Sequence, residues 1–207
     1  MVAFAAFQIN QKNGKLVVRR LIKSLAGLSL AVAITQPLSA CAAPNNENEA
    51  LRNTHEKIVR NFEGVSHISA ASLSDMAPKE YVLFDVRESE EYDVSHINGA
   101  IWVDPDIDAE EFLELYGDRL KGKFVILYCS VGVRSSRIAE QIKAYQSSPT
   151  STSIYNLEAG VFGWHNEKRP LVQLSEDGPI STEFIRPYNR WWGRMLNRDA
   201  LKKYNSD

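Results

Sequence analysis

The residues best suited to do chemistry lie in the stretch YCSVGVRSS, Tyr128 to Ser136. Cys129 ends an apolar run, and the loop that follows it holds Gly132 and Arg134. A cysteine is a nucleophile only as its thiolate. The backbone N–H groups of a loop that leads into a helix N-terminus stabilise such an anion, and an arginine adds a permanent positive charge. This spacing therefore predicts a nucleophilic Cys129 in an anion-binding loop.

The other loop residues have predicted parts as well. Gly132 allows a backbone conformation that is closed to other residues, and Arg134 offers a forked donor for an oxyanion such as thiosulfate. Either Ser135 or Ser136 is predicted to cap the helix that follows. The predicted substrate-binding loop consists of Ser130, Val131, Gly132, Val133, Arg134 and Ser135.

Two chemistries use a cysteine in a loop of this kind. Hydrolysis of phosphate esters by tyrosine-phosphatase-like enzymes uses the pattern Cys-x5-Arg, and the second chemistry is the transfer of a sulfane sulfur. Here four residues separate Cys129 from Arg134, and Ser135 stands where a phosphatase needs its arginine. The shorter loop favours sulfur transfer over a small phosphatase.

Strand and helix patterns alternate around this loop. Strands are predicted at YVLFDV (81–86), KFVILYC (123–129) and SIYNLE (153–158), with shorter ones expected at 67–70 and 99–103. Helices are expected at 49–62, from Ser72 as cap, at 108–120, from 135 and from 160, with a helix or turn at 88–97. This order predicts an α/β fold with a central parallel sheet and helices on both faces. Cys129 and Asp85 then lie at the C-terminal ends of two of these strands, which is the sheet edge where sites form.

Three motifs together resemble single-domain rhodaneses. LFDVRESEEYDVSHINGAI (83–101) is similar to the first signature of that family, YCSVGVRSS resembles its active-site loop, and NLEAGVFGWHNEKRPL (156–171) resembles its closing segment. The resemblance implies a rhodanese-like fold and a persulfide carried on Cys129. It implies a small sulfur donor (thiosulfate or a persulfide), a thiol or cyanide-type acceptor, and no metal or organic cofactor.

Within the first motif, Asp85 and Arg87 are interpreted as an ion pair that supports the motif, and His96 as a residue that holds a loop. Ser130 replaces a frequent arginine, and Ala159 replaces a usual glycine. These departures leave the sulfur donor open. They also leave an alternative in which the domain senses sulfide or oxidants, or binds a partner, without useful turnover.

The first 40 residues have the composition of an export signal. They hold five bases and no acid, followed by the apolar run LAGLSLAVAIT and then by LSAC, Leu38 to Cys41. LSAC resembles the lipobox of bacterial lipoproteins, which implies a lipid on Cys41 and a membrane-anchored protein on the periplasmic face. The alternative is a plain secretory signal. If Cys41 is lipidated, Cys129 is the single remaining thiol.

The predicted organisation is a signal peptide (1–40), a polar tether with a leading helix (41–65), the rhodanese domain (66–173) and a C-terminal extension (174–207). Residues 41–207 hold 19 bases and 26 acids, and this net charge of −7 argues against a nucleic-acid partner. The extension is predicted to form an amphipathic helix that lies on a membrane surface or packs on the domain. Its basic face would hold Arg190, Arg194 and Arg198, and its apolar face Tyr188, Trp192, Met195 and Leu196.

Overall fold

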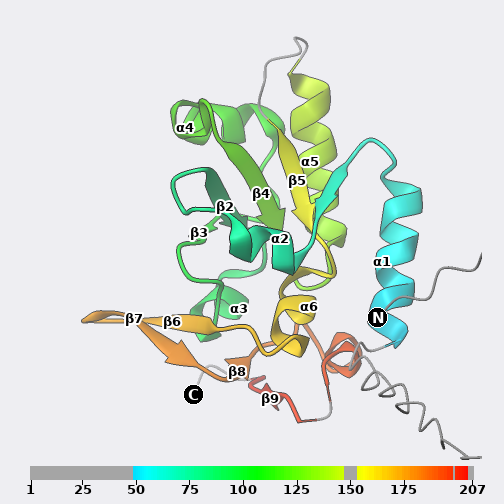
Figure 1. The fold of residues 1–207 in the computed structure, drawn as a ribbon, viewed down its shortest axis with the longest axis vertical. Coiled ribbons are helices and arrows are strands. Elements are labelled where there is room, and N and C mark those ends of the chain that lie inside the picture. The colour runs from blue at the N-terminus through cyan, green and yellow to red at the C-terminus, as the bar shows by residue number, and fades with distance from the viewer. Residues whose placement is uncertain (1–48, 147–152, 198, 205–207) are drawn as a thin grey trace, which may run out of the picture. The chain divides into compact units, whose positions relative to one another are not determined.

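A five-stranded parallel sheet forms the centre of the computed structural model, which describes residues 49–146, 153–197 and 199–204. The strand order is β1-β5-β4-β2-β3 (Figure 1). The strands are β1 (Ser66–Ile68), β2 (Tyr81–Asp85), β3 (Ile101–Trp102), β4 (Phe124–Tyr128) and β5 (Ile154–Leu157). Because β4 is the central strand, between β5 and β2, its C-terminal end lies at the middle of the sheet edge. Cys129 is the residue that follows it.

Helices cover both faces of this sheet, as predicted. They are α1 (Glu49–Asn61), α2 (Ala70–Asp75), α3 (Ser89–Val94), α4 (Ala109–Leu120), α5 (Val133–Tyr145) and α6 (Gly160–Asn166). On one face, Phe84 and Leu127 of the sheet belong to the same buried cluster as Phe112 of α4. On the other face, Ile126 shares a cluster with Phe162 of α6. Successive strand residues therefore pack on opposite faces, which is why the strands read as continuous apolar runs.

Most elements agree with the predicted ranges, but the start of α2 does not. Ser69, not Ser72, is its N-cap, because the Ser69 hydroxyl accepts a hydrogen bond of 3.0 Å from the backbone N–H of Ser72. The predicted start of α4 is confirmed, since the side chain of Asp108 accepts a bond of 2.9 Å from the N–H of Glu111. The sequence alone allows either serine as the cap. The extended backbone of Ser69 and its bond to the N–H of Ser72 identify Ser69 as the cap.

The C-terminal segment contains a hairpin and short strands in place of the predicted amphipathic helix. Its elements are β6 (Leu171–Ser175), β7 (Gly178–Thr182), β8 (Phe184–Ile185), a single 3₁₀ turn η1 (Trp192–Met195) and β9 (Leu201–Lys202). Ile185, Met195 and Leu196 are buried in the cluster that contains Ile126. The segment thus packs on the domain, and tertiary burial outweighs a weak helical pattern that Gly193 interrupts.

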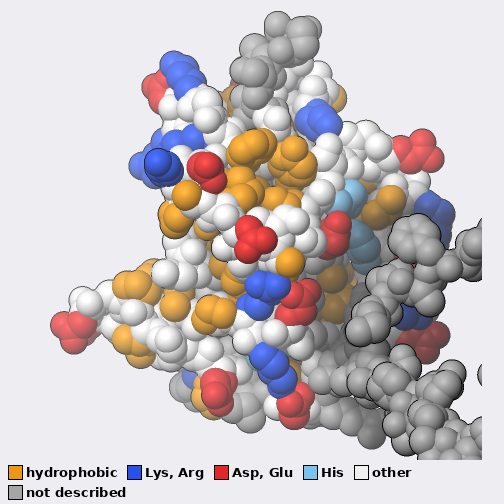
Figure 2. All heavy atoms as spheres, in the orientation of Figure 1, with side chains coloured by type: hydrophobic (Ala, Val, Ile, Leu, Met, Phe, Trp, Pro, Cys, Tyr) orange, Lys and Arg blue, Asp and Glu red, His pale blue; other side chains and the backbone are white. Residues whose placement is uncertain are grey.

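Apolar side chains also gather on the surface over the β6–β7 hairpin (Figure 2), where Leu174 and Ile180 are 59% and 46% exposed. Among the helices that the structure describes, none combines the length and apolar character needed to cross a bilayer. The predicted signal segment, Cys41 and Arg198 lie outside the described residues.

Candidate active site

The loop after β4 places the sulfur of Cys129 beside a helix N-terminus. The side chain of Cys129 is 2% exposed, and its Sγ accepts a hydrogen bond of 3.2 Å from the backbone N–H of Gly132. Helix α5 begins at the next residue, Val133, and the N–H groups of its first turn have no acceptor within the helix. Amide dipoles and the helix end therefore favour negative charge on this sulfur.

Gly132 makes this turn possible. Its φ of +104° is a conformation that L side chains rarely adopt, and a Cβ atom there would stand 2.9 Å from Nδ2 of Asn156. Gly132 is also the N-cap of α5. The prediction that a serine caps this helix is wrong, because Ser135 and Ser136 lie within its first turn and are buried.

Residues beneath the loop fix it from behind. The hydroxyl of Ser135 donates a bond of 2.6 Å to Oδ1 of Asn156, a buried residue of β5. The N-terminus of α6 donates to the loop backbone, with Val161 N–H bonded to the carbonyl of Cys129 at 2.9 Å. Phe162 N–H bonded to the carbonyl of Ser130 at 3.0 Å completes the contact. These bonds turn two loop carbonyls towards α6.

Arg134 lies in the site, and two glutamates bind it. Its Nη1 donates to Glu88 at 3.0 Å, and its Nη2 donates to Glu91 at 2.9 Å. Burial opposes the charged form, but attraction to Cys129 and to both carboxylates outweighs it and raises the pKa of the guanidinium. Binding of an oxyanion by Arg134 stays a prediction, and such an anion would compete with these carboxylates. Glu88 belongs to the first motif (83–101), but nothing in the sequence indicated that it pairs with Arg134.

Ser130 joins the same network. Its hydroxyl donates a bond of 2.7 Å to Oε1 of Glu91, while Glu91 is almost fully buried. The other oxygen of that carboxylate accepts from Arg134. One buried glutamate of α3 therefore holds two residues of the loop, one at each end.

Asp85 and Arg87 form a fully buried ion pair, with 2.6 Å between Arg87 Nη2 and Asp85 Oδ2. The same nitrogen donates to the carbonyl of Ser95 at 2.6 Å. Burial opposes the positive charge, but the carboxylate of Asp85 outweighs it and raises the pKa of Arg87. Both side chains of the pair are fully buried. Through the bond to Ser95, the pair ties the end of β2 to the segment after α3.

His96 lies in that segment and is 2% exposed. Its ring stacks on Tyr92 with 3.9 Å between centroids, and its Nδ1 lies 3.0 Å from the Tyr92 carbonyl oxygen. Its backbone pairs with Val172 of β6. Burial lowers the pKa of His96, which favours the neutral ring. These contacts position a loop against the hairpin.

A cavity of about 200 Å³ opens over the loop. Its lining consists of Glu88, Cys129, Ser130, Val131, Val133, Arg134, Tyr188 and Trp192. The structure thus brings Cys129 together with most of the predicted loop and adds two aromatic residues of the C-terminal segment. Tyr188 and Trp192 were predicted on an apolar helix face, and nothing in the sequence placed them over the cysteine.

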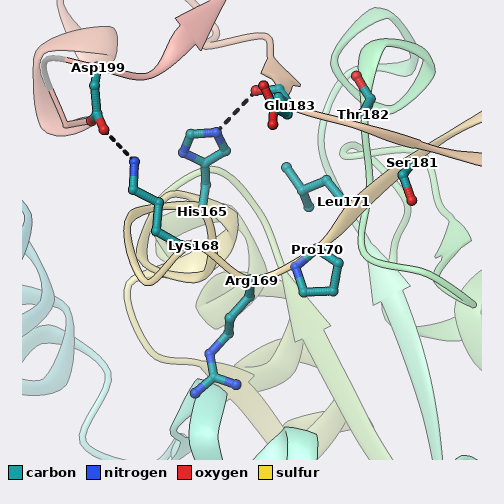
Figure 3. A pocket seen from close by; sticks show the side chains of 9 residues that line it. All are labelled: His165, Lys168, Arg169, Pro170, Leu171, Ser181, Thr182, Glu183 and Asp199. Atoms are coloured by element: carbon teal, nitrogen blue, oxygen red, sulfur yellow. Dashed lines mark hydrogen bonds and ion pairs between the residues drawn. The ribbon is translucent and has the colours of Figure 1, made fainter.

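A larger cavity lies elsewhere, between α6 and the hairpin (Figure 3). Two interactions lie within its lining: Lys168 pairs with Asp199 at 2.5 Å, and His165 Nε2 lies 3.3 Å from the carbonyl oxygen of Glu183. It contains no cysteine. Within the described part of the chain, no group of three or more His, Cys, Asp or Glu side chains is placed to hold a metal.

Part of the chain is similar to known proteins. Residues 69–167 match the family described as Rhodanese-like domain. A tRNA uridine(34) hydroxylase of Bacillus velezensis is 35% identical over 68 residues, which cover 31% of this chain and 20% of that protein. A probable adenylyltransferase/sulfurtransferase MoeZ of Mycobacterium tuberculosis is 31% identical over 94 residues, which cover 44% of this chain and 22% of that protein.

Among solved structures, a thiosulfate sulfurtransferase from Pseudomonas aeruginosa aligns with a TM-score of 0.46 and 20% identity, over 62% of this chain and 23% of that one. A rhodanese-related protein from Thermoplasma volcanium aligns with a TM-score of 0.42 and 26% identity, over 52% and 97%. The chain spans about a fifth of the length of the two curated relatives. The part that they share with this chain is the rhodanese-like domain of residues 69–167.

Proposed function

We propose that the rhodanese-like domain of residues 69–167 is a sulfurtransferase that carries sulfane sulfur as a persulfide on Cys129. The observation that carries this proposal is the Gly132 N–H bonded to Cys129 Sγ at 3.2 Å, at the start of α5 and beneath a cavity of about 200 Å³. An N–H donor and a helix N-terminus stabilise both the attacking thiolate and the persulfide anion that replaces it. The family match supports the same chemistry.

The reaction has two balanced steps. In the first, the Cys129 thiolate attacks the outer sulfur of thiosulfate, the S–S bond of the donor breaks, and sulfite leaves with the bonding electron pair. Cys129 then carries –S–S⁻. In the second, a thiophilic acceptor such as cyanide or a thiolate attacks the outer sulfur, and the Cys129 thiolate is released. No net oxidation occurs, so no further reactant is required.

The intact mass of the protein tests this proposal. After treatment with thiosulfate or a persulfide, the mass should increase by one sulfur atom, and cyanide should remove it. Cys129→Ser should prevent the gain while its circular dichroism stays unchanged. A folded protein whose cysteine reacts with an alkylating agent but gains no sulfur from either donor would contradict the proposal. A persulfide that forms but is not passed on would favour the sensing alternative.

We also propose that the protein is exported and anchored by a lipid on Cys41, on the periplasmic face of a membrane. The support is the acid-free basic start, the short apolar run and the motif Leu38 to Cys41. Labelling with a fatty-acid analogue should mark the wild-type protein in the membrane fraction. Cys41→Ser should abolish the label. Unlabelled wild-type protein in the soluble fraction would instead support a plain secretory signal.

A further inference from the structure

Two aromatic residues from outside the matched domain form part of the cavity over Cys129. Tyr188 and Trp192 follow the hairpin, beyond residue 167 where the family match ends. Trp192 packs against the buried cluster, and the ring of Tyr188 lies 5.5 Å from Cζ of Arg134. Together with Val131 and Val133 they give the cavity an apolar lining.

The charges around this cavity do not suit a dianion. Its charged lining residues besides Cys129 are Glu88 and Arg134, and Arg134 also pairs with buried Glu91. Two carboxylates therefore surround one guanidinium, which leaves a net negative charge before Cys129 ionises. These carboxylates would repel a dianion that enters the cavity, and the low dielectric of a buried site strengthens this repulsion.

From these two features we infer that the preferred sulfur donor carries an apolar substituent and at most one negative charge, as in an aryl thiosulfonate or an organic persulfide. This inference rests on the proposed sulfur transfer and names the donor class for the same site. Tyr188 and Trp192 determine the specificity, because the apolar substituent packs on them while its sulfane sulfur meets Cys129. Thiosulfate is a small dianion without an apolar substituent, so it gains no contact with these two aromatic rings. The carboxylates of Glu88 and Glu91 repel it.

The chemistry with such a donor balances in the same way. The Cys129 thiolate attacks the outer sulfur of benzenethiosulfonate, the S–S bond breaks, and benzenesulfinate leaves with the electron pair. The protein retains –S–S⁻ on Cys129, and the total charge is unchanged. Methanethiosulfonate reacts in the same way and carries the same charge as benzenethiosulfonate. The two donors differ in the substituent, which is methyl in one and phenyl in the other.

The test measures kcat/KM for benzenethiosulfonate, methanethiosulfonate and thiosulfate, with cyanide as acceptor. In the wild-type protein, we expect the phenyl donor to exceed the methyl donor by about tenfold, as apolar contacts of this size give. Tyr188→Ala and Trp192→Ala should each lower this phenyl-to-methyl ratio several-fold. Tyr188 is 58% exposed, so its replacement is compatible with folding. Tyr145→Ala is the matched control, since Tyr145 is 50% exposed and does not line the cavity.

The rate with thiosulfate should be the lowest of the three, and added salt should increase it by screening the repulsion. Equal phenyl-to-methyl ratios in wild type and Tyr188→Ala, or a preference for thiosulfate, would overturn this inference while the sulfur transfer stands. Failure of Cys129 to take sulfur from any of the three donors would overturn the proposed function and this inference with it.

Discussion

Gly160 lies against the backbone of Cys129 so closely that a Cβ atom on it would stand 2.3 Å from the cysteine carbonyl oxygen. The carbonyl carbon of Ser130 would be 2.8 Å away. The two residues lie 31 positions apart in the sequence, in different motifs, and the contact brings them together at the base of the loop. The closing motif therefore supports the nucleophile directly, and its glycine is required by space as well as by a φ of +56°.

Replacing Gly160 with alanine should both destabilise the protein and disturb the loop. The new methyl group would collide with backbone atoms that cannot move without shifting Cys129. We expect the free energy of unfolding to fall by about 3 kcal/mol or more, measured by urea denaturation. Transfer of sulfur to Cys129 should slow in the fraction that folds.

Gly178→Ala is the control for that variant. Gly178 also has a positive φ, of +110°, but a Cβ atom there meets no atom within 4 Å. It should cost only the conformational strain, about 1–2 kcal/mol, and leave sulfur transfer unchanged. Equal losses in the two variants would show that the contact with Cys129 is unimportant.

Ala159 adopts a left-handed conformation, with φ of +56°, at the position where the related motif usually has glycine. Ala159→Gly should relieve this strain, and the greater entropy of an unfolded glycine offsets only part of the gain. We expect the free energy of unfolding to rise by about 0.5–1 kcal/mol. Ala144→Gly, on an exposed position of helix α5, should lower it by about 1 kcal/mol. Thermal or urea unfolding should show that the two variants change the free energy of unfolding in opposite directions. A loss of stability in Ala159→Gly would contradict the strain at this residue.

Arg87→Met should destabilise the protein by about 3–5 kcal/mol, because it leaves the carboxylate of Asp85 buried without its partner. Both side chains are inaccessible, so the sulfur donor cannot touch them. The rate of persulfide formation per folded molecule should therefore persist. Lys121→Met breaks an exposed ion pair with Asp118 and should leave the unfolding midpoint unchanged. A stable Arg87→Met protein with no persulfide formation would instead assign Arg87 to the reaction.

Glu88→Gln should make the site more receptive to thiosulfate. The change removes one of the two negative charges that bind Arg134, while Glu91 still holds the guanidinium in place. We expect kcat/KM for thiosulfate to rise about three- to tenfold and to depend less on salt. Glu90→Gln is the control, because the carboxylate of Glu90 accepts a bond from Ser89 and not from Arg134, and it should change neither value. An unchanged rate in Glu88→Gln would mean that these carboxylates do not oppose the dianion.

Stability should decrease with acidification from about pH 7.5 to about pH 5.5. Burial lowers the pKa values of His67, His96 and His165 below 6.5, and His55 contributes at His67. The unfolded chain then binds protons on these rings at a higher pH than the folded protein, so protonation favours unfolding as the pH falls. Urea denaturation across this range should show a declining free energy, and His67→Gln should reduce the decline. A flat profile would contradict the lowered pKa values.

Several features of the protein follow from local sequence. The apolar runs before Asp85 and Cys129 predict the buried parallel strands correctly, because burial on both faces leaves a continuous signature in the chain. Gly132 and its spacing from Cys129 predict the loop, and the proximity of Asp85 to Arg87 makes their ion pair readable. These features depend on neighbours within a few positions, so the sequence by itself determined them.

The tertiary structure decided which distant side chains meet at the nucleophile. Glu88 and Glu91 lie 46 and 43 positions before Arg134, and their pairing with it depends on how α3 packs against the loop. The segment that carries Tyr188 and Trp192 was predicted as a helix, but burial of its neighbours in the core draws it over the cysteine as a short turn. Periodicity records whether a residue is buried and in which element. It does not record which partner the residue meets, because that partner is set by the packing of elements far apart in the chain.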